Sequence, residues 1–155
     1  MKFKTKEDID APMDYVFGAL TDFEALERQA MRRGASVRRM DAQTQPGEGM
    51  GWEIGFPFRG KPRELTVTMM HFAPPSRMSF DGTMQGLSGT MDVELLALSR
   101  TRTRMILEIE LKPETLSARL LMQSIKLARG SINKRFQVRV AEYAKTMEER
   151  YGRMA

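Results

Sequence analysis

The chain has 155 residues, 41% of them hydrophobic and 29% charged, with a formal net charge of +5 and no cysteine. Its length suits a single domain spanning residues 1–155, and this mixture of apolar and charged residues is typical of a globular protein rather than a disordered one. The absence of cysteine excludes disulfides, thiolate catalysis and cysteine-ligated zinc or iron–sulfur sites.

The first part of the chain predicts one strand and two short helices. Residues 2–9 alternate between apolar and polar side chains, as a half-exposed strand does. Pro12 suits the first position of the helix that follows, where its missing N–H has no partner to lose. Thr21-Asp22-Phe23-Glu24 has the spacing of a capping box and predicts the start of a second helix, with Gly34 as the glycine that ends it.

Residues 35–112 change to a period of two and predict an antiparallel meander with one solvated face. Segments rich in glycine, proline and serine separate the strands, and Asp81-Gly82 and Gly86–Gly89 are interpreted in the same way, as turns or a bulge. Glu53 is predicted to face outward, because it shares its parity with Gly51 and Gly55. The apolar positions of the alternation are Trp52, Ile54, Phe56, Phe58, Leu65, Val67, Met69, Met78, Phe80, Met91, Val93, Leu95, Met105, Leu107, Ile109 and Leu111.

From Thr115 to Tyr151, apolar residues recur at steps of three and four and predict a long amphipathic helix. Unbroken, this helix would be about 55 Å long at 1.5 Å per residue. That length exceeds the breadth of a compact domain of this size. We therefore expect a bend or break near Gly130-Ser131, with the second segment packed across the sheet.

This order of elements predicts a curved sheet wrapped around a helix, with a gap between them. A strongly twisted sheet cannot touch a straight helix along its whole length, so side chains or a ligand fill the gap. Methionine tolerates guests of different shapes, although such stripes form core more often than they bind ligands. The candidate ligand-binding residues are Trp52, Phe56, Met69, His71, Met78, Phe80, Met91, Met105, Leu107, Met122 and Ile125.

The segment Ile9-Asp10-Ala11-Pro12-Met13-Asp14-Tyr15-Val16-Phe17, followed by Leu20-Thr21-Asp22-Phe23-Glu24, resembles the opening of the SRPBCC superfamily. This START-like, helix-grip group includes polyketide cyclase/dehydrase and lipid-transport proteins, and its element order is similar over essentially the full chain. The resemblance implies an α+β fold in which a curved seven-stranded antiparallel sheet wraps around a long C-terminal helix, with two short helices after the first strand. It also implies an apolar pocket, but it fixes no activity, because members bind lipids, steroids or aromatic compounds, act as cyclases, or serve as accessory subunits.

Little in the sequence points to catalysis. His71 is the only histidine, and alternation places it on the same face as Met69, at the mouth of the expected pocket. A structural role for it is favoured over a catalytic one. No Gly-x-Ser-x-Gly elbow and no spaced cluster of metal ligands is present, so we predict no catalytic residue, cofactor or metal.

Three functions remain open. The favoured one is a non-enzymatic carrier or sensor that binds a small apolar or amphipathic molecule. The second is a cyclase or hydratase in which His71, or an inward Tyr or Arg, moves protons. The third is an interaction module that binds nucleic acid or acidic partners through its basic surface.

The basic residues are densest at Arg32-Arg33 with Arg38-Arg39, and at Arg100-Arg102-Arg104. Such groups are more often a solvated face, so no nucleic-acid partner is expected, and the chain is compatible with a monomer or a homodimer. No apolar run approaches the roughly 20 residues of a membrane-spanning helix. The first six residues lack the apolar core of a signal peptide, and we predict a cytoplasmic location. Contact of the last helix with a membrane surface is a minority alternative.

Overall fold

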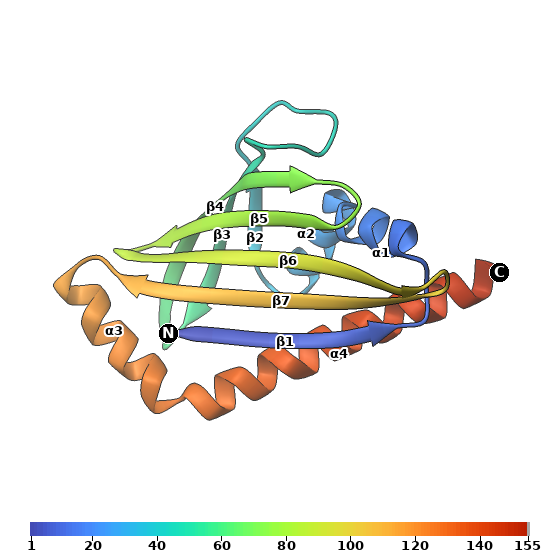
Figure 1. Cartoon of the computed structure of the whole chain (residues 1–155). Coiled ribbons are helices and arrows are strands. Elements are labelled where there is room, and N and C mark those ends of the chain that lie inside the picture. Colours follow the sequence, from blue (N-terminus) through green and yellow to red (C-terminus); the bar gives the residue numbers. More distant parts are fainter. Residues whose placement is uncertain (155) are drawn as a thin grey trace.

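The computed structural model describes residues 1–154, which form one seven-stranded antiparallel sheet and four helices (Figure 1). The strand order is β1-β7-β6-β5-β4-β3-β2, so β2 to β7 form a meander and β1 adds to its far edge. The predicted fold class is confirmed. The elements are β1 (Lys2–Ile9), α1 (Met13–Leu20), α2 (Phe23–Arg32), β2 (Ser36–Arg39), β3 (Gly51–Phe58), β4 (Lys61–Ala73), β5 (Arg77–Met84), β6 (Leu87–Ser99), β7 (Arg102–Pro113), α3 (Leu116–Leu127) and α4 (Arg129–Met154).

The register brings the alternating apolar residues onto one face of the sheet. Met69 lies opposite Phe80, which lies opposite Met91, and Met91 lies opposite Ile109. Paired residues of neighbouring strands point to the same side of the sheet, so the apolar side chains of successive strands lie on one side. We call this side the inner face.

The two short helices begin about one residue away from the predicted positions. Asp22, not Thr21, caps α2, because its Oδ1 accepts the backbone N–H of Ala25 at 3.3 Å. Pro12 is the residue before α1 rather than its first residue. Gly34 does end α2 with a positive φ of 97°, as predicted.

The C-terminal helical segment is broken at Ala128, which separates α3 from α4. The predicted break near Gly130-Ser131 is therefore confirmed, although Gly130 itself lies in the first turn of α4. In Figure 1, α3 sits at one end of the sheet, and α4 returns alongside β1 toward α1.

Asp81-Gly82, predicted to be a turn or a bulge, lies inside β5, whereas the stretch Gly86–Gly89 begins in a turn, as predicted, and continues into β6. Gly82 is in β5, and the turn comes later, at Gln85-Gly86, where both residues have positive φ. A Cβ at Gly82 would come within 3.3 Å of a methyl carbon of Leu65, and one at Gly89 within 3.0 Å of a methyl carbon of Leu111. These glycines make room for leucines of neighbouring strands. In the sequence alone, glycines with this packing role look the same as glycines that form turns.

The predicted position of His71 is wrong. The register of β4 against β5 shifts between Met69 and His71, and Met70 is exposed. Since one extra residue inverts the alternation, His71 pairs with Ser79 on the outer face, and Phe72 returns to the inner face opposite Met78.

Two apolar clusters cover the inner face. The first cluster lies under α1, α2 and α4, and includes Ile9, Phe17, Phe23, Trp52, Met69, Met78, Phe80, Leu95, Met105, Val140 and Met147. The second cluster lies under α3, and its buried members are Phe3, Met84, Leu87, Ala118, Met122 and Ile125.

Candidate functional site

At the two ends of the inner face, side chains are buried in the two clusters. Between these ends, the side chains of the inner face are more exposed to solvent. In the first cluster, Met69 and Met105 are at most 1% exposed, so they have no free surface. In the second cluster, Met122 and Ile125 are 4% and 5% exposed. Between the clusters, several apolar inner-face side chains are only half-buried. We call these residues the middle strip: Ile54, Phe56, Leu65, Val67, Met91, Leu107 and Ile109.

The candidate ligand-binding residues therefore divide into two groups. Phe56, Met91 and Leu107 belong to the middle strip. Those enclosed in the clusters are Trp52, Met69, Met78, Phe80, Met105, Met122 and Ile125. His71 lies on the outer face, away from both groups.

The candidate set omitted four members of the middle strip, namely Ile54, Leu65, Val67 and Ile109. All four share the alternation that identified the others, and could have been found by it. The set also omitted Phe136 of α4, which packs against both clusters.

Trp52 is held at the edge of the first cluster by polar contacts. Its Nε1 donates to Glu27 at 3.0 Å, and the guanidinium of Arg39 lies 5.5 Å from the centre of its ring. Arg39 also lies 3.7 Å from Glu27. These contacts join α2 to β2 and β3, and they fix the orientation of the indole.

Asp41 completes this arrangement on the loop after β2. It forms an ion pair with Arg39 at 2.6 Å and accepts the backbone N–H groups of Gly51 at 2.8 Å and Gln43 at 2.9 Å. The hydrogen bond from Arg39 and these two N–H groups hold the pKa of Asp41 well below its ordinary value. The loop between β2 and β3 is thus anchored by a carboxylate that stays charged.

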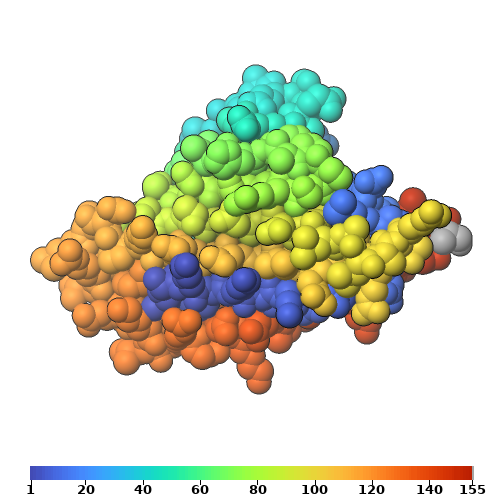
Figure 2. Space-filling model, viewed as in Figure 1, coloured from blue at the N-terminus to red at the C-terminus, as the bar shows by residue number. Residues whose placement is uncertain are grey.

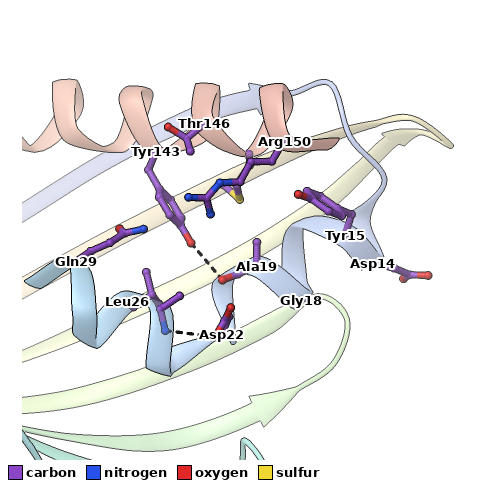
Figure 3. A pocket seen from close by; sticks show the side chains of 12 residues that line it. Asp14, Tyr15, Gly18, Ala19, Asp22, Leu26, Gln29, Tyr143, Thr146 and Arg150 are labelled. Carbon is purple, nitrogen blue, oxygen red and sulfur yellow. Dashed lines mark hydrogen bonds between the residues drawn. The ribbon is translucent and has the colours of Figure 1, made fainter. Parts of the chain in front are cut away.

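A second concave feature, the helix groove, lies where α4 crosses α1 and α2 (Figure 3). It has a volume of about 390 Å³ and an open side. Tyr143 points from α4 toward α1, where its hydroxyl donates to the carbonyl of Ala19 at 3.2 Å, and Arg150 extends toward it. The groove and the first cluster share Met147, which is 2% exposed.

Burial raises the pKa of Tyr143 to about 12 from an ordinary 10.0, against a smaller opposing effect of Arg150. The unfolded chain therefore loses this proton at lower pH than the folded one. The contribution of the buried, neutral Tyr143 to the free energy of unfolding is complete below pH 10, and it declines as the pH rises toward 12.

We expect the free energy of unfolding to fall by about 2–3 kcal/mol across this interval because of Tyr143 alone. Urea unfolding at a series of pH values measures this decline. Tyr143→Phe should start about 1 kcal/mol less stable, since it lacks the hydrogen bond, and should decline less steeply. A variant that declines as steeply as the original protein would show that another group is responsible.

The outer face has a shallow depression over β2, β3 and β4, with a volume of about 610 Å³. Arg38 pairs there with Glu53 at 2.9 Å, so the predicted outward orientation of Glu53 is confirmed. A hydrogen bond with Glu53, together with its charge, raises the pKa of Glu64. The same hydrogen bond and Arg38 lower the pKa of Glu53.

Four of the seven arginines in the densest basic groups of the sequence form ion pairs with neighbouring carboxylates. Arg104 forms an ion pair with Asp8 at 2.8 Å, and Arg102 lies 3.8 Å from the same carboxylate. Arg38 and Arg39 are paired as described above. Within residues 1–154, no three His, Asp or Glu side chains gather as metal ligands.

No helix in the described part of the chain combines the length and the apolar character required to cross a membrane.

No protein-family model matches this chain, and a search of curated proteins finds no match. Solved structures do match. The Zhui aromatase/cyclase from Streptomyces sp. R1128 matches with a TM-score of 0.67 and 14% identity, over 97% of this chain and 95% of that one. Ara h 8.0201 matches with a TM-score of 0.61 and 13% identity, over 94% of this chain and 98% of that one.

A START superfamily protein from Mycobacterium smegmatis matches with a TM-score of 0.57 and 8% identity, over 86% of this chain and 95% of that one. At these identities the similarity concerns the fold and carries no statement about a ligand or a reaction. Together with the strand order and the position of the helices, the matches confirm the resemblance found in the sequence: this chain has the START-like helix-grip fold of SRPBCC proteins.

Proposed function

We propose that residues 1–155 act as one cytoplasmic ligand-binding domain, which binds a small apolar or amphipathic molecule against the inner face, as a carrier or sensor. The ligand would lie on the middle strip, between the sheet and α4. The buried members of the two clusters would form the ends of this site rather than contact the ligand.

The observation that carries this proposal is the incomplete burial of the middle strip. Val67, Met91 and Leu107 lie on the side of the sheet that the helices cover, yet all three are half-buried. Apolar surface in contact with water favours association with an apolar molecule, by roughly 25 cal/mol for each Å² removed from water. Met91, in the centre of the strip, has a flexible side chain that can adjust to the shape of a guest.

The fold supports the same proposal. START-like proteins resembled by this sequence commonly bind apolar molecules, and the chain matches an aromatase/cyclase in fold. The enzyme alternative loses its main candidate, because His71 is exposed on the outer face and cannot reach a molecule on the middle strip.

Filling the strip tests the proposal. We expect Met91→Trp to weaken binding of the fluorescent probe 1-anilinonaphthalene-8-sulfonate and of palmitate by about tenfold or more, since the indole occupies the space of the guest. Fluorescence titration gives the probe affinity, and competition with palmitate gives that of the fatty acid. Native mass spectrometry of the freshly purified protein then shows whether a molecule is carried from the cell.

Thr90→Trp is the matched control, because Thr90 is exposed on the opposite face of the same strand. It should leave both affinities unchanged. Equal binding by the two variants, or no binding of either compound by the original protein and no carried mass, would contradict the proposal. Circular dichroism melting establishes that both variants are folded.

A further inference from the structure

Helix α3 has a second apolar face, directed away from the protein. Leu116, Leu120 and Leu127 are 75%, 66% and 92% exposed. At about 100° per residue, the three side chains project within an arc of about 40°. The opposite side of the helix carries Ala118, Met122 and Ile125, which pack into the second cluster. We call the exposed residues Leu116, Leu120 and Leu127 the leucine stripe.

The leucine stripe lies on an exposed end of the molecule. In Figure 1, α3 stands at the end of the sheet farthest from the C-terminus, and Figure 2 shows that it forms the surface there. Single exposed apolar residues are ordinary, but three large ones aligned on a helix of 12 residues mark an interaction surface.

The charges on α3 itself all have one sign. Arg119 and Lys126 are the only charged residues of α3, and both are exposed. Between Thr115 and Ala141 the sequence has no Asp or Glu, while it has six basic residues: Arg119, Lys126, Arg129, Lys134, Arg135 and Arg139. Arg59 of the β3–β4 turn adds a further cation beside α3, since it donates to the carbonyl of Ser124 at 3.3 Å. Within residues 1–154, no carboxylate is paired with Arg119 or Lys126.

We propose that α3 docks the protein on anionic phospholipid bilayers. The leucine stripe would enter the boundary between headgroups and acyl chains, while Arg119, Lys126 and Arg59 contact the anionic headgroups. A helix with leucines on one side and cations beside them is suited to lie in this interface. This proposal goes beyond the proposed function and holds whether or not the inner face binds a ligand.

The same charges argue against a second copy as the occupant. A symmetric antiparallel pair would set the stripe of one copy against the stripe of the other, and would bring Arg119 of each copy close to Lys126 of the other. Like charges brought together at a contact weaken the association. Anionic headgroups neutralise these cations instead.

Vesicle flotation tests the docking directly. We expect the full chain to float with vesicles of phosphatidylcholine and phosphatidylserine, to float less with phosphatidylcholine alone, and to detach as salt is added. Changing the stripe to glutamine (Leu116→Gln, Leu120→Gln and Leu127→Gln together) should weaken binding by about tenfold or more. Glutamine is nearly as good a helix former as leucine, so α3 should persist.

The control replaces exposed leucines elsewhere. Leu96 and Leu98 of β6 are 43% and 44% exposed, and Leu96→Gln with Leu98→Gln should leave flotation unchanged. Arg119→Gln with Lys126→Gln touches no core residue and should weaken binding by about fivefold per cation on the anionic vesicles only. If the triple leucine variant unfolds at a lower temperature than the original protein, the variant with Arg119→Gln and Lys126→Gln still tests the proposal.

Two results would overturn the proposal. The first is a chain that fails to float with phosphatidylserine vesicles, or that floats equally well with the stripe changed to glutamine. The second is a dimer, detected by sedimentation velocity, that vesicles do not dissociate and that the triple variant abolishes. The stripe would then be the contact between two copies.

Discussion

Met105→Ala should lower the free energy of unfolding by about 2–5 kcal/mol. Met105 is completely buried on the inner face of β7, opposite Leu95 of β6 and Glu7 of β1. Its loss removes the transfer energy of the side chain and leaves a cavity in the first cluster. Urea unfolding, followed by the fluorescence of the single tryptophan, Trp52, measures the change in the cluster to which both residues belong.

Met70→Ala is the control for this experiment. Met70 is 43% exposed at the bulge of β4, so the same change of side chain there should alter the free energy of unfolding by less than about 0.5 kcal/mol. If Met105→Ala had an equally small effect, the first cluster would not be solidly packed. The site for a guest would then extend beyond the middle strip into the part of the inner face that the first cluster occupies.

Gly86→Ala should lower the free energy of unfolding by about 2–4 kcal/mol. Gly86 has a φ of +81° in the turn between β5 and β6, where an L side chain is strained. A Cβ there would also lie 2.8 Å from the Cγ2 of Thr115. Thr115 caps α3 by accepting the N–H of Ala118 at 3.1 Å, so the substitution displaces the start of that helix.

Gly60→Ala separates the two causes. Gly60 has a similar φ of +74°, but a Cβ there would meet nothing within 4 Å. It should therefore show only the backbone strain, about 1 kcal/mol. Hydrogen exchange should accelerate in α3 for Gly86→Ala alone, and equal effects of the two substitutions would show that the contact with Thr115 is unimportant.

The local periodicity of the chain was enough to predict the order of elements and the apolar face of each strand. The length of the C-terminal helical pattern, compared with the breadth of a compact domain, predicted its break. The period of two carried Trp52, Met69, Phe80 and Met91 to one face, as the register confirms. The family resemblance supplied the number of strands and the wrapping of the sheet.

Predictions failed where the environment of a residue depends on a neighbour that is distant in the chain. Gly82 has the sequence of a turn but serves to admit Leu65 from β4. His71 has the parity of Met69 only until the bulge shifts the register. The local sequence pattern does not show that a leucine of another strand packs against a glycine, nor that a bulge adds a residue to a strand.

The sequence by itself determined which side chains share a face, because that depends on the geometry of one strand or one helix. Only the tertiary structure decided which of these apolar residues are enclosed and which remain partly open. Met105 and Leu107 follow the same alternation on β7, yet the first is completely buried and the second half-buried. The difference arises from where the helices lie over a twisted sheet, and that placement depends on contacts among segments far apart in the chain.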